Sequence, residues 1–244
     1  MPLVITEGYL IGRYNYLEFD EILVFINKLG NKFTCIAKGT KKIQSKNARA
    51  LQWGNFLQIE LFHSSSTNKL SKLKKVTILN NLDFKKSCNL ALITISDVLC
   101  SLKTTNLKCF NFYQEIIIKI LNDYDEYKLS IYIFIYFIKH FLKTIKVIKC
   151  IHNKNQKYYF DFITSSFICC ECNIKNTPLT IDELLLIVNY YKNSNDTWEN
   201  FFSNKYNINW EEFYAKLRTS FNKYINKINE IYYKGINKNV KSKI

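Results

Sequence analysis

The hydrophobic pattern of this chain changes near residue 80, and this change constrains its fold more than any other feature. Before it, short apolar runs separated by polar or glycine-containing turns are typical of β-strands, and Gly8 and Gly12 in the first run suit a bend or bulge. The predicted strands cover residues 4–14, 21–27, 32–37, 56–62 and 73–79. Residues 45–51, between the third and fourth runs, suit one or two helical turns with Ser45 as N-cap. Five strands with a helical connection after the third is the order of an OB-fold, a small barrel that commonly binds oligonucleotides.

After residue 80 the apolar residues recur at helical spacing. The predicted helices cover residues 89–102, 110–121, 131–148, 181–191 and 210–232. Thr180 and Glu183 match a capping box, and the basic tail from Lys234 is expected to fray. We therefore predict an α+β protein with an N-terminal five-stranded OB-fold barrel in residues 1–80 and a helical domain in residues 81–244.

Positive charge is concentrated in the first third of the chain. The 244 residues carry a formal net charge of +15, which favours polyanionic partners such as nucleic acid or an anionic membrane surface. The chain is rich in residues with A/T-rich codons, a bias that would spread lysine evenly. Residues 1–80 nevertheless hold 12 Lys or Arg and 5 Asp or Glu, a net +7 that is about half of the excess. The position of the charge is therefore more informative than its total.

Much of that excess lies in one segment, Ala37–Gln52, which we call the basic connection. It contains five cations and no acid. Such side chains release counterions from nucleic acid, and nearby aromatic rings can stack on unpaired bases. We predict nucleic-acid contacts by Arg13, Lys38, Lys41, Lys42, Lys46, Arg49, Tyr14 and Trp53, with Tyr16 and Phe33 as further stacking candidates. The alternative is a solvated, lysine-rich loop whose aromatic neighbours belong to the core.

The eight cysteines, without a recognisable signal peptide, favour reduced thiols or a metal site over a disulfide framework. Cys169 and Cys172 form a CxxC after a strand-like hairpin, and zinc is usually held by four S or N ligands from two such knuckles. We predict a zinc-ribbon-like hairpin at about residues 150–172, with zinc held by Cys150, Cys169, Cys172 and, as fourth ligand, His152 or Cys170. The alternative is a hairpin of reduced thiols without metal, because Asn153 stands where the first knuckle needs a cysteine. The other cysteines, predicted to be core residues, are Cys35, Cys88, Cys100 and Cys109.

Motifs for catalysis or nucleotide binding are missing from the sequence. It has no P-loop or GxGxxG pattern, so no nucleotide cofactor is expected. Two acidic clusters, residues 18–21 and 123–126, indicate turn and cap chemistry, with a Mg²⁺-dependent nuclease as the alternative. The most apolar run, residues 129–138, is about half as long as a membrane-spanning helix. We expect a cytoplasmic, nucleoid-associated protein that is not an enzyme and has no membrane partner; a peripheral membrane protein is a further alternative.

A series of short motifs also runs through residues 6–52. They are Thr6-Glu7-Gly8, Arg13-Tyr14, Glu18 with Asp20, Gly30, Ala37-Lys38-Gly39, Lys41-Lys42, Ser45-Lys46 and Leu51-Gln52. In this order they resemble the start of the RecO family of bacterial recombination mediators. Ser165-Ser166 with Cys169 and Cys172 is similar to the second knuckle of that family, whereas Asn153 departs from the first. The basic C-terminal tail is a weaker match.

The resemblance implies a protein without catalytic turnover that binds single- and double-stranded DNA and anneals complementary strands. It also implies that the protein helps to load RecA onto DNA coated by single-strand-binding protein. The implied partners are RecR and the acidic, apolar C-terminal tail of that binding protein, for which Lys139, Lys143 and Lys146 on one helix are candidate contacts. A generic OB-fold RNA-binding module without a recombination role is the alternative, and it would discriminate through the 2′-OH.

Overall fold

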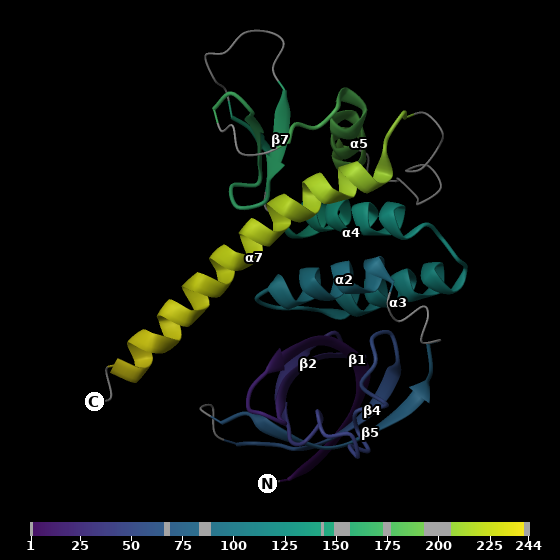
Figure 1. Cartoon of the computed structure of the whole chain (residues 1–244), viewed down its shortest axis with the longest axis vertical. Helices are drawn as coiled ribbons and strands as arrows, with labels where there is room; N and C mark the ends of the chain where they lie inside the picture. Colours follow the sequence, from purple (N-terminus) through teal and green to yellow (C-terminus); the bar gives the residue numbers. More distant parts are fainter. Residues whose placement is uncertain are drawn as a thin grey trace. The chain divides into compact units, whose positions relative to one another are not determined.

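The computed structural model describes residues 2–65, 69–82, 89–142, 144–148, 157–172, 177–192 and 206–241. The chain divides into two compact units, Met1–Leu129 (unit 1) and Ser130–Ile244 (unit 2). Strands form the first part of unit 1, and helices occupy much of the remaining described chain (Figure 1). The predicted α+β class is therefore confirmed. The predicted domain boundary at residue 80 stays a prediction. The compact unit that contains the five strands continues to Leu129.

Five strands of unit 1 close into a barrel in the order β1-β2-β3-β5-β4 (Figure 1). Their bounds are Leu3–Asn15 for β1, Glu21–Asn27 for β2, Lys32–Ala37 for β3, Phe56–Phe62 for β4 and Ser71–Asn80 for β5. Neighbouring strands are antiparallel except β3 and β5, which are parallel. The middle three bounds agree with the prediction, and β1 and β5 are longer than predicted.

Strand β1 closes the barrel because it pairs with β4 along its first half and with β2 along its second. The change of partner falls at Gly8 and Tyr9, and Gly12 follows where the strand pairs with β2 alone. A Cβ at Gly8 would lie 2.1 Å from the carbonyl oxygen of Ile26, and one at Gly12 would lie 2.9 Å from Cys100 Sγ. The register with β2 also shifts between Leu10 and Gly12. The predicted bend or bulge is therefore confirmed.

The barrel core is formed by the inward residues of the alternating strands. They include Leu10, Leu23, Phe25, Cys35, Leu57 and Ile59. Phe33 and Trp53 pack against this core and are partly buried, and the Phe33 ring stacks on Phe25 with centroids 5.4 Å apart. Burial raises the pKa of the Cys35 thiol to about 12, so this cysteine is a core residue, as predicted.

Two helices of unit 1 pack against the barrel, α2 (Leu90–Ser101) and α3 (Leu107–Leu121). Each begins after an asparagine whose side chain caps the first turn. Cys100 Sγ donates to the Ile11 carbonyl at 2.9 Å, and the rings of Tyr9 and Tyr113 lie 4.9 Å apart. The helices therefore extend the barrel core. Cys109 is buried here and Cys100 is half-buried, whereas Cys88 lies outside the described residues.

Unit 2 combines helices with a small sheet. Helix α4 (Glu126–Phe141) begins just before the unit boundary, and α5 (Ile181–Lys192) and α7 (Trp210–Lys241) follow. Strands β6 (Lys146–Val147), β7 (Tyr158–Asp161) and β8 (Ser166–Cys169) form the sheet in the order β6-β8-β7. Buried phenylalanines of α4, α7 and the β7–β8 hairpin pack together; Phe134 and Phe221, for example, lie 5.1 Å apart. Within the described ranges, no helix has both the length and the hydropathy to cross a membrane.

Three predictions about this half can be compared with the structure. The capping box is confirmed, because Glu183 N–H donates to Thr180 Oγ1 at 3.2 Å and Thr180 N–H donates to Glu183 Oε2 at 2.7 Å. The predicted helix over residues 131–148 is too long, since Lys146 and Val147 pair with β8 instead. Lys146 therefore does not share a helix with Lys139, and Lys143 lies outside the described residues. The predicted last helix, residues 210–232, is too short, because α7 continues to Lys241.

Candidate nucleic-acid interface

The basic connection is built from turns and contains no regular helix, so the predicted helical turns are not formed. Gly39 has a φ of 66°, which glycine tolerates because it has no Cβ, and the chain therefore reverses its direction directly after β3. The Ser45 N–H then donates to the Lys42 carbonyl at 2.9 Å, so Ser45 closes a turn rather than capping a helix. A single helix-like bond joins Leu51 N–H to the Asn47 carbonyl at 3.2 Å.

Asparagine side chains attach the basic connection to the rest of the barrel. Asn47 Oδ1 accepts from the backbone N–H of Val76 on β5 at 3.1 Å. Asn55 Nδ2 donates to the Ala50 carbonyl at 3.3 Å, while its Oδ1 accepts from Leu82 N–H at 2.9 Å. Because these bonds satisfy backbone groups that the turns leave unpaired, they hold the connection in one path.

The loop between β1 and β2, residues 16–20, lies beside the start of the basic connection. Gly39 N–H donates to Asp20 Oδ1 at 2.8 Å, and Lys41 N–H donates to the Phe19 carbonyl at 3.2 Å. Lys42 Nζ lies over the Phe19 ring, 5.3 Å from its centroid, a distance suited to a cation–π contact. Two segments of opposite character, one apolar and one basic, are thus joined at one end of the barrel.

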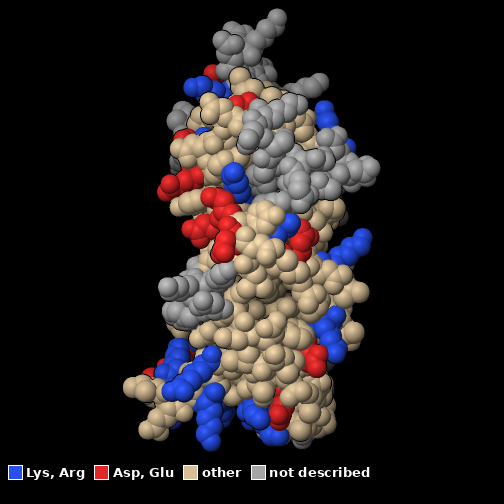
Figure 2. Space-filling model, turned by 90° about the vertical axis from the view of Figure 1, so that its right-hand side faces the viewer, with Lys and Arg blue, Asp and Glu red and all other residues tan. Residues whose placement is uncertain are grey.

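The five cations of the basic connection are exposed: Lys38, Lys41, Lys42, Lys46 and Arg49. Among the residues that the structure describes, none of these side chains lies within ion-pair distance of a carboxylate. Figure 2 shows Lys and Arg side chains gathered over the barrel. A surface of this kind presents uncompensated charge to a phosphate backbone.

Strand β5 adds cations that the sequence analysis did not include. Lys72 and Lys75 are exposed on β5, next to the backbone groups that Asn47 holds. Lys74 is already paired with Glu60 at 3.0 Å. The sequence indicates exposed lysines here, because lysines flank buried Leu73 and Val76 in the fifth predicted strand. Only the order of the strands in the barrel shows that β5 lies beside the basic connection.

Arg13 has a different environment from the other predicted contacts. Its Nε and Nη2 form a bidentate ion pair with Glu21, at 3.2 and 2.8 Å, and its Nη1 donates to the Leu51 carbonyl at 3.1 Å. Burial would raise the pKa of Glu21, but the hydrogen bond from Arg13, the Thr40 hydroxyl and the charge of Lys41 together place that pKa below its ordinary value. Arg13 therefore joins β1, β2 and the end of the basic connection.

The predicted stacking residues separate into two groups. Tyr14 and Tyr16 are half exposed at the end of β1, whereas Phe33 and Trp53 pack on the core. Leu17 and Phe19 of the β1–β2 loop are also exposed, and the sequence analysis did not single them out. Two large apolar residues inside a short loop between strands are unusual, and this pattern in the sequence could have indicated a binding surface.

An open pocket of about 520 Å³ lies where the loop meets the connection. It is lined by Leu17, Glu18, Phe19, Asp20, Lys38, Gly39 and Lys42. The pocket therefore offers one aromatic ring, aliphatic carbon, two lysines and two carboxylates. Of the carboxylates, Asp20 is engaged with Gly39 N–H.

The second acidic cluster has the cap contacts that the sequence predicts, whereas the contacts of the first join separate strands and loops of the barrel. In the first cluster, Asp20 accepts from Gly39 N–H and Glu21 pairs with Arg13. In the second, Asp125 accepts from Lys128 N–H at 2.8 Å and Glu126 accepts from Leu90 N–H at 3.1 Å. Over the described ranges, no three His, Cys, Asp or Glu side chains gather as a metal site.

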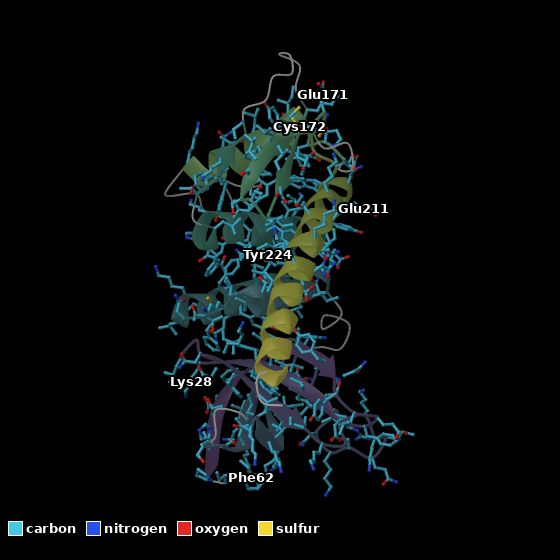
Figure 3. The ribbon with its side chains drawn as sticks, turned by 90° about the vertical axis from the view of Figure 1, so that its left-hand side faces the viewer. Lys28, Phe62, Glu171, Cys172, Glu211 and Tyr224 are labelled. Carbon is cyan, nitrogen blue, oxygen red and sulfur yellow. The ribbon has the colours of Figure 1, made fainter. Side chains whose placement is uncertain are left out.

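Antiparallel β7 and β8 form a hairpin within the predicted range, whereas the zinc-ribbon-like character of residues 150–172 stays a prediction. Cys169 ends β8 and is buried, while Cys172 is exposed (Figure 3). The Cys172 N–H donates to the Cys169 carbonyl at 3.1 Å, which closes the CxxC turn. Cys150 and His152 lie outside the described residues, so the complete zinc ligand set stays a prediction.

Comparison with known proteins finds relatives of this chain that share one name. Residues 1–82 match the family model described as "Recombination protein O N terminal". The chain is similar to the DNA repair protein RecO of Mycoplasma mycoides, with 24% identity over 194 residues that cover 77% of this chain and 76% of the relative. The protein of the same name from Mesoplasma florum is 29% identical over 72% of this chain and 69% of its own length. That from Clostridium perfringens is 34% identical over 48% of each chain.

Proposed function

We propose that this chain, which is similar to DNA repair proteins named RecO, belongs to their family and acts as a DNA-binding recombination mediator. It binds single- and double-stranded DNA through the barrel, which we assign as an OB-fold, and it anneals complementary strands. It also assists RecA loading, together with RecR, on DNA coated by single-strand-binding protein. The observation that carries this proposal is the set of five exposed cations on the basic connection that have no described acidic partner.

Annealing by this protein rests on charge neutralisation. Two complementary strands repel each other through their phosphates, and a surface of mobile lysines screens that repulsion while it holds one strand weakly. Lys38, Lys41, Lys42 and Lys46 project from turns that the asparagine bonds hold in place, so the cations are concentrated without a described carboxylate partner. Such a mechanism needs neither a nucleotide cofactor nor a bond-forming residue.

Strand annealing in the presence of single-strand-binding protein tests the DNA role and the partner together. We expect the protein to accelerate annealing of complementary oligonucleotides, and to do so also when they are coated. Deleting the acidic C-terminal tail of the binding protein should abolish the effect on coated strands only. If naked strands anneal no faster with the protein than without it, the proposed function is wrong.

Competition between DNA and RNA strands of matched sequence separates this function from a generic RNA-binding module. A DNA mediator should bind the DNA strand at least as tightly, because phosphate contacts do not require the 2′-OH. A preference for RNA of about ten-fold, equal to about 1.4 kcal/mol, would favour the RNA-binding module.

Zinc binding by the cysteine hairpin is a separate part of the proposal. Cys169 and Cys172 have the thiol chemistry that zinc prefers, and their CxxC turn is closed by a backbone hydrogen bond. Cys150 and His152 or Cys170 would complete the ligands, and zinc would stabilise the hairpin without taking part in DNA annealing. Metal analysis of the purified protein should find zinc, and Cys169→Ser with Cys172→Ser should remove it. Protein purified without chelator that contains no zinc would contradict this part.

A further inference from the structure

The β1–β2 loop exposes apolar side chains that the fold itself does not require. Leu17 is 60% exposed and Phe19 is 42% exposed. The loop keeps its shape through backbone bonds, because Tyr16 and Leu17 N–H both donate to the Asp20 carbonyl at 3.2 and 3.4 Å. Since neither apolar side chain is needed for those bonds, both are available to a ligand.

The open pocket beside this loop divides its chemistry between two sides. Leu17, Glu18, Phe19 and Asp20 come from the loop, whereas Lys38, Gly39 and Lys42 come from the basic connection. A phosphate alone would be matched by the lysines but repelled by the carboxylates. A ligand that carries an aromatic ring beside a phosphate matches both sides, since the ring can lie on the apolar side and the phosphate on the lysines.

We propose that this pocket holds one unpaired nucleobase, stacked on the Phe19 ring, with the adjoining phosphate on Lys38 and Lys42. The proposal rests on the DNA-binding function proposed above and gives it a residue that distinguishes single strands from duplexes. Lys42 Nζ is 5.3 Å from the Phe19 centroid, so one cation lies within reach of both the ring and the phosphate that follows the base. The exposed Glu18 carboxylate lines the same pocket and can accept a hydrogen bond from an N–H group on the base edge.

A duplex cannot use this site in the same way. Its bases are already stacked and paired, and one of them would have to leave the stack to reach Phe19, at a cost of a few kcal/mol. The pocket therefore favours single strands, while the exposed lysines serve both. This assigns different parts of one surface to the two DNA forms that an annealing protein must hold.

The chain offers a matched control in Phe62. Its ring is 38% exposed, close to the value for Phe19, and Lys74 Nζ lies 6.0 Å from its centroid. Phe62 pairs with Leu3 at the first end of β1, whereas the β1–β2 loop follows the other end of that strand. Figure 3 shows Phe62 on the barrel. Phe19→Ala and Phe62→Ala thus remove the same side chain next to opposite ends of β1, and only the lysine beside Phe62 is paired with a carboxylate.

The test measures Kd for oligo-dT, for an abasic strand of the same length and for a duplex, at one salt concentration. Phe19→Ala should weaken oligo-dT binding about ten-fold, the size expected for one base stacked on an aromatic ring, and should leave the abasic strand and the duplex within about two-fold. Phe19→Tyr should restore oligo-dT binding, and Phe62→Ala should change none of the three. Thermal unfolding checks that each variant is folded.

Three results would overturn the stacking site. Equal Kd values of the wild-type protein for oligo-dT and the abasic strand would show that no base is held. An equal loss with Phe62→Ala, or a loss with Phe19→Ala that includes the abasic strand and the duplex, would show that Phe19 is not specific for a base. If the wild-type protein binds none of the three ligands, the proposed DNA function itself fails, and that outcome is distinct from the others.

Discussion

The basic connection of unit 1 and the α5–α7 contact of unit 2 use lysine in opposite ways. On α7, Lys216 Nζ lies 3.1 Å from Glu183 and 2.9 Å from Glu212, and the side chains of Lys216 and Glu183 are only 6% and 2% exposed. On the basic connection the lysines are exposed and have no described carboxylate within ion-pair distance. The net charge of a chain therefore does not give the number of its DNA contacts. A lysine inside a buried ion pair stabilises the fold, whereas an exposed lysine on the basic connection remains available to bind phosphate.

Breaking the buried pair should have the largest effect on the fold. Lys216→Ala removes the cation that pairs with buried Glu183 in the described part of the chain, and removing one partner of such a pair costs about 3–5 kcal/mol. The free energy of unfolding from urea titration measures this loss. Lys227→Ala, an exposed position on the same helix, should change stability by less than about 0.5 kcal/mol. If Lys216→Ala lowers the free energy of unfolding as little as Lys227→Ala does, the Lys216–Glu183 pair is not desolvated.

Arg13 lies between the two extremes, and its replacement should have the second largest effect. Arg13→Ala removes the partner of buried Glu21 and the donor to the Leu51 carbonyl, so we expect a loss of about 1–3 kcal/mol. Arg49→Ala is the matched control because it removes an exposed arginine of the basic connection without a described ion pair. If the two variants lose the same stability, Arg13 is not a structural anchor.

The same variant should change how stability depends on pH. In the wild-type protein the pKa of Glu21 lies below its ordinary value of 4.5, so its contribution is complete above that pH and is lost as the pH falls. Without Arg13, burial raises that pKa, and Glu21 then destabilises the fold increasingly as the pH rises. The difference in free energy of unfolding between wild type and Arg13→Ala should therefore grow from pH 4 to pH 7. A constant difference, measured by urea titration at each pH, would contradict this assignment.

The sequence predicted most of the barrel because each strand is encoded by its own alternation of apolar residues. It did not predict the end of α4, since Lys146 and Val147 are strand residues only through β8, a partner about twenty residues away. It also did not predict the role of Arg13, because the carboxylate that holds it lies across a hairpin. Phe19 was missed for the same reason: its neighbours Lys38 and Lys42 come from another connection of the barrel.

Gly39 tests whether the path of the basic connection is fixed locally. Its φ of 66° lies in the left-handed region, and an added Cβ would be 3.7 Å from Lys42 Cδ, an ordinary contact. Gly39→Ala should therefore cost only the backbone strain, about 1 kcal/mol. Gly39→Asn should lose less, because asparagine tolerates this conformation. Urea titration of both variants measures the difference, and equal losses would indicate a steric cause instead.

Removing lysines from the basic connection should have the smallest effect on the fold and a clear effect on DNA. Replacing Lys41, Lys42 and Lys46 with Ala should change the free energy of unfolding by less than about 0.5 kcal/mol. The slope of log Kobs against log salt should fall by about two to three units, one for each lost phosphate contact, for every DNA sequence. Arg49, which matches no RecO motif, should contribute least among the five cations.

The control for this charge change comes from the opposite end of the barrel. Lys28, Lys103 and Lys108 are exposed there, around the β2–β3 turn and the start of α3, where the Gly30 carbonyl accepts from Thr105 Oγ1. Figure 3 labels Lys28. Replacing these three with Ala removes the same net charge, so any long-range electrostatic effect is matched. If both triple variants lower the salt slope equally, DNA responds to the total charge of the barrel. If only the Lys41, Lys42 and Lys46 variant lowers it, the phosphate contacts belong to the basic connection.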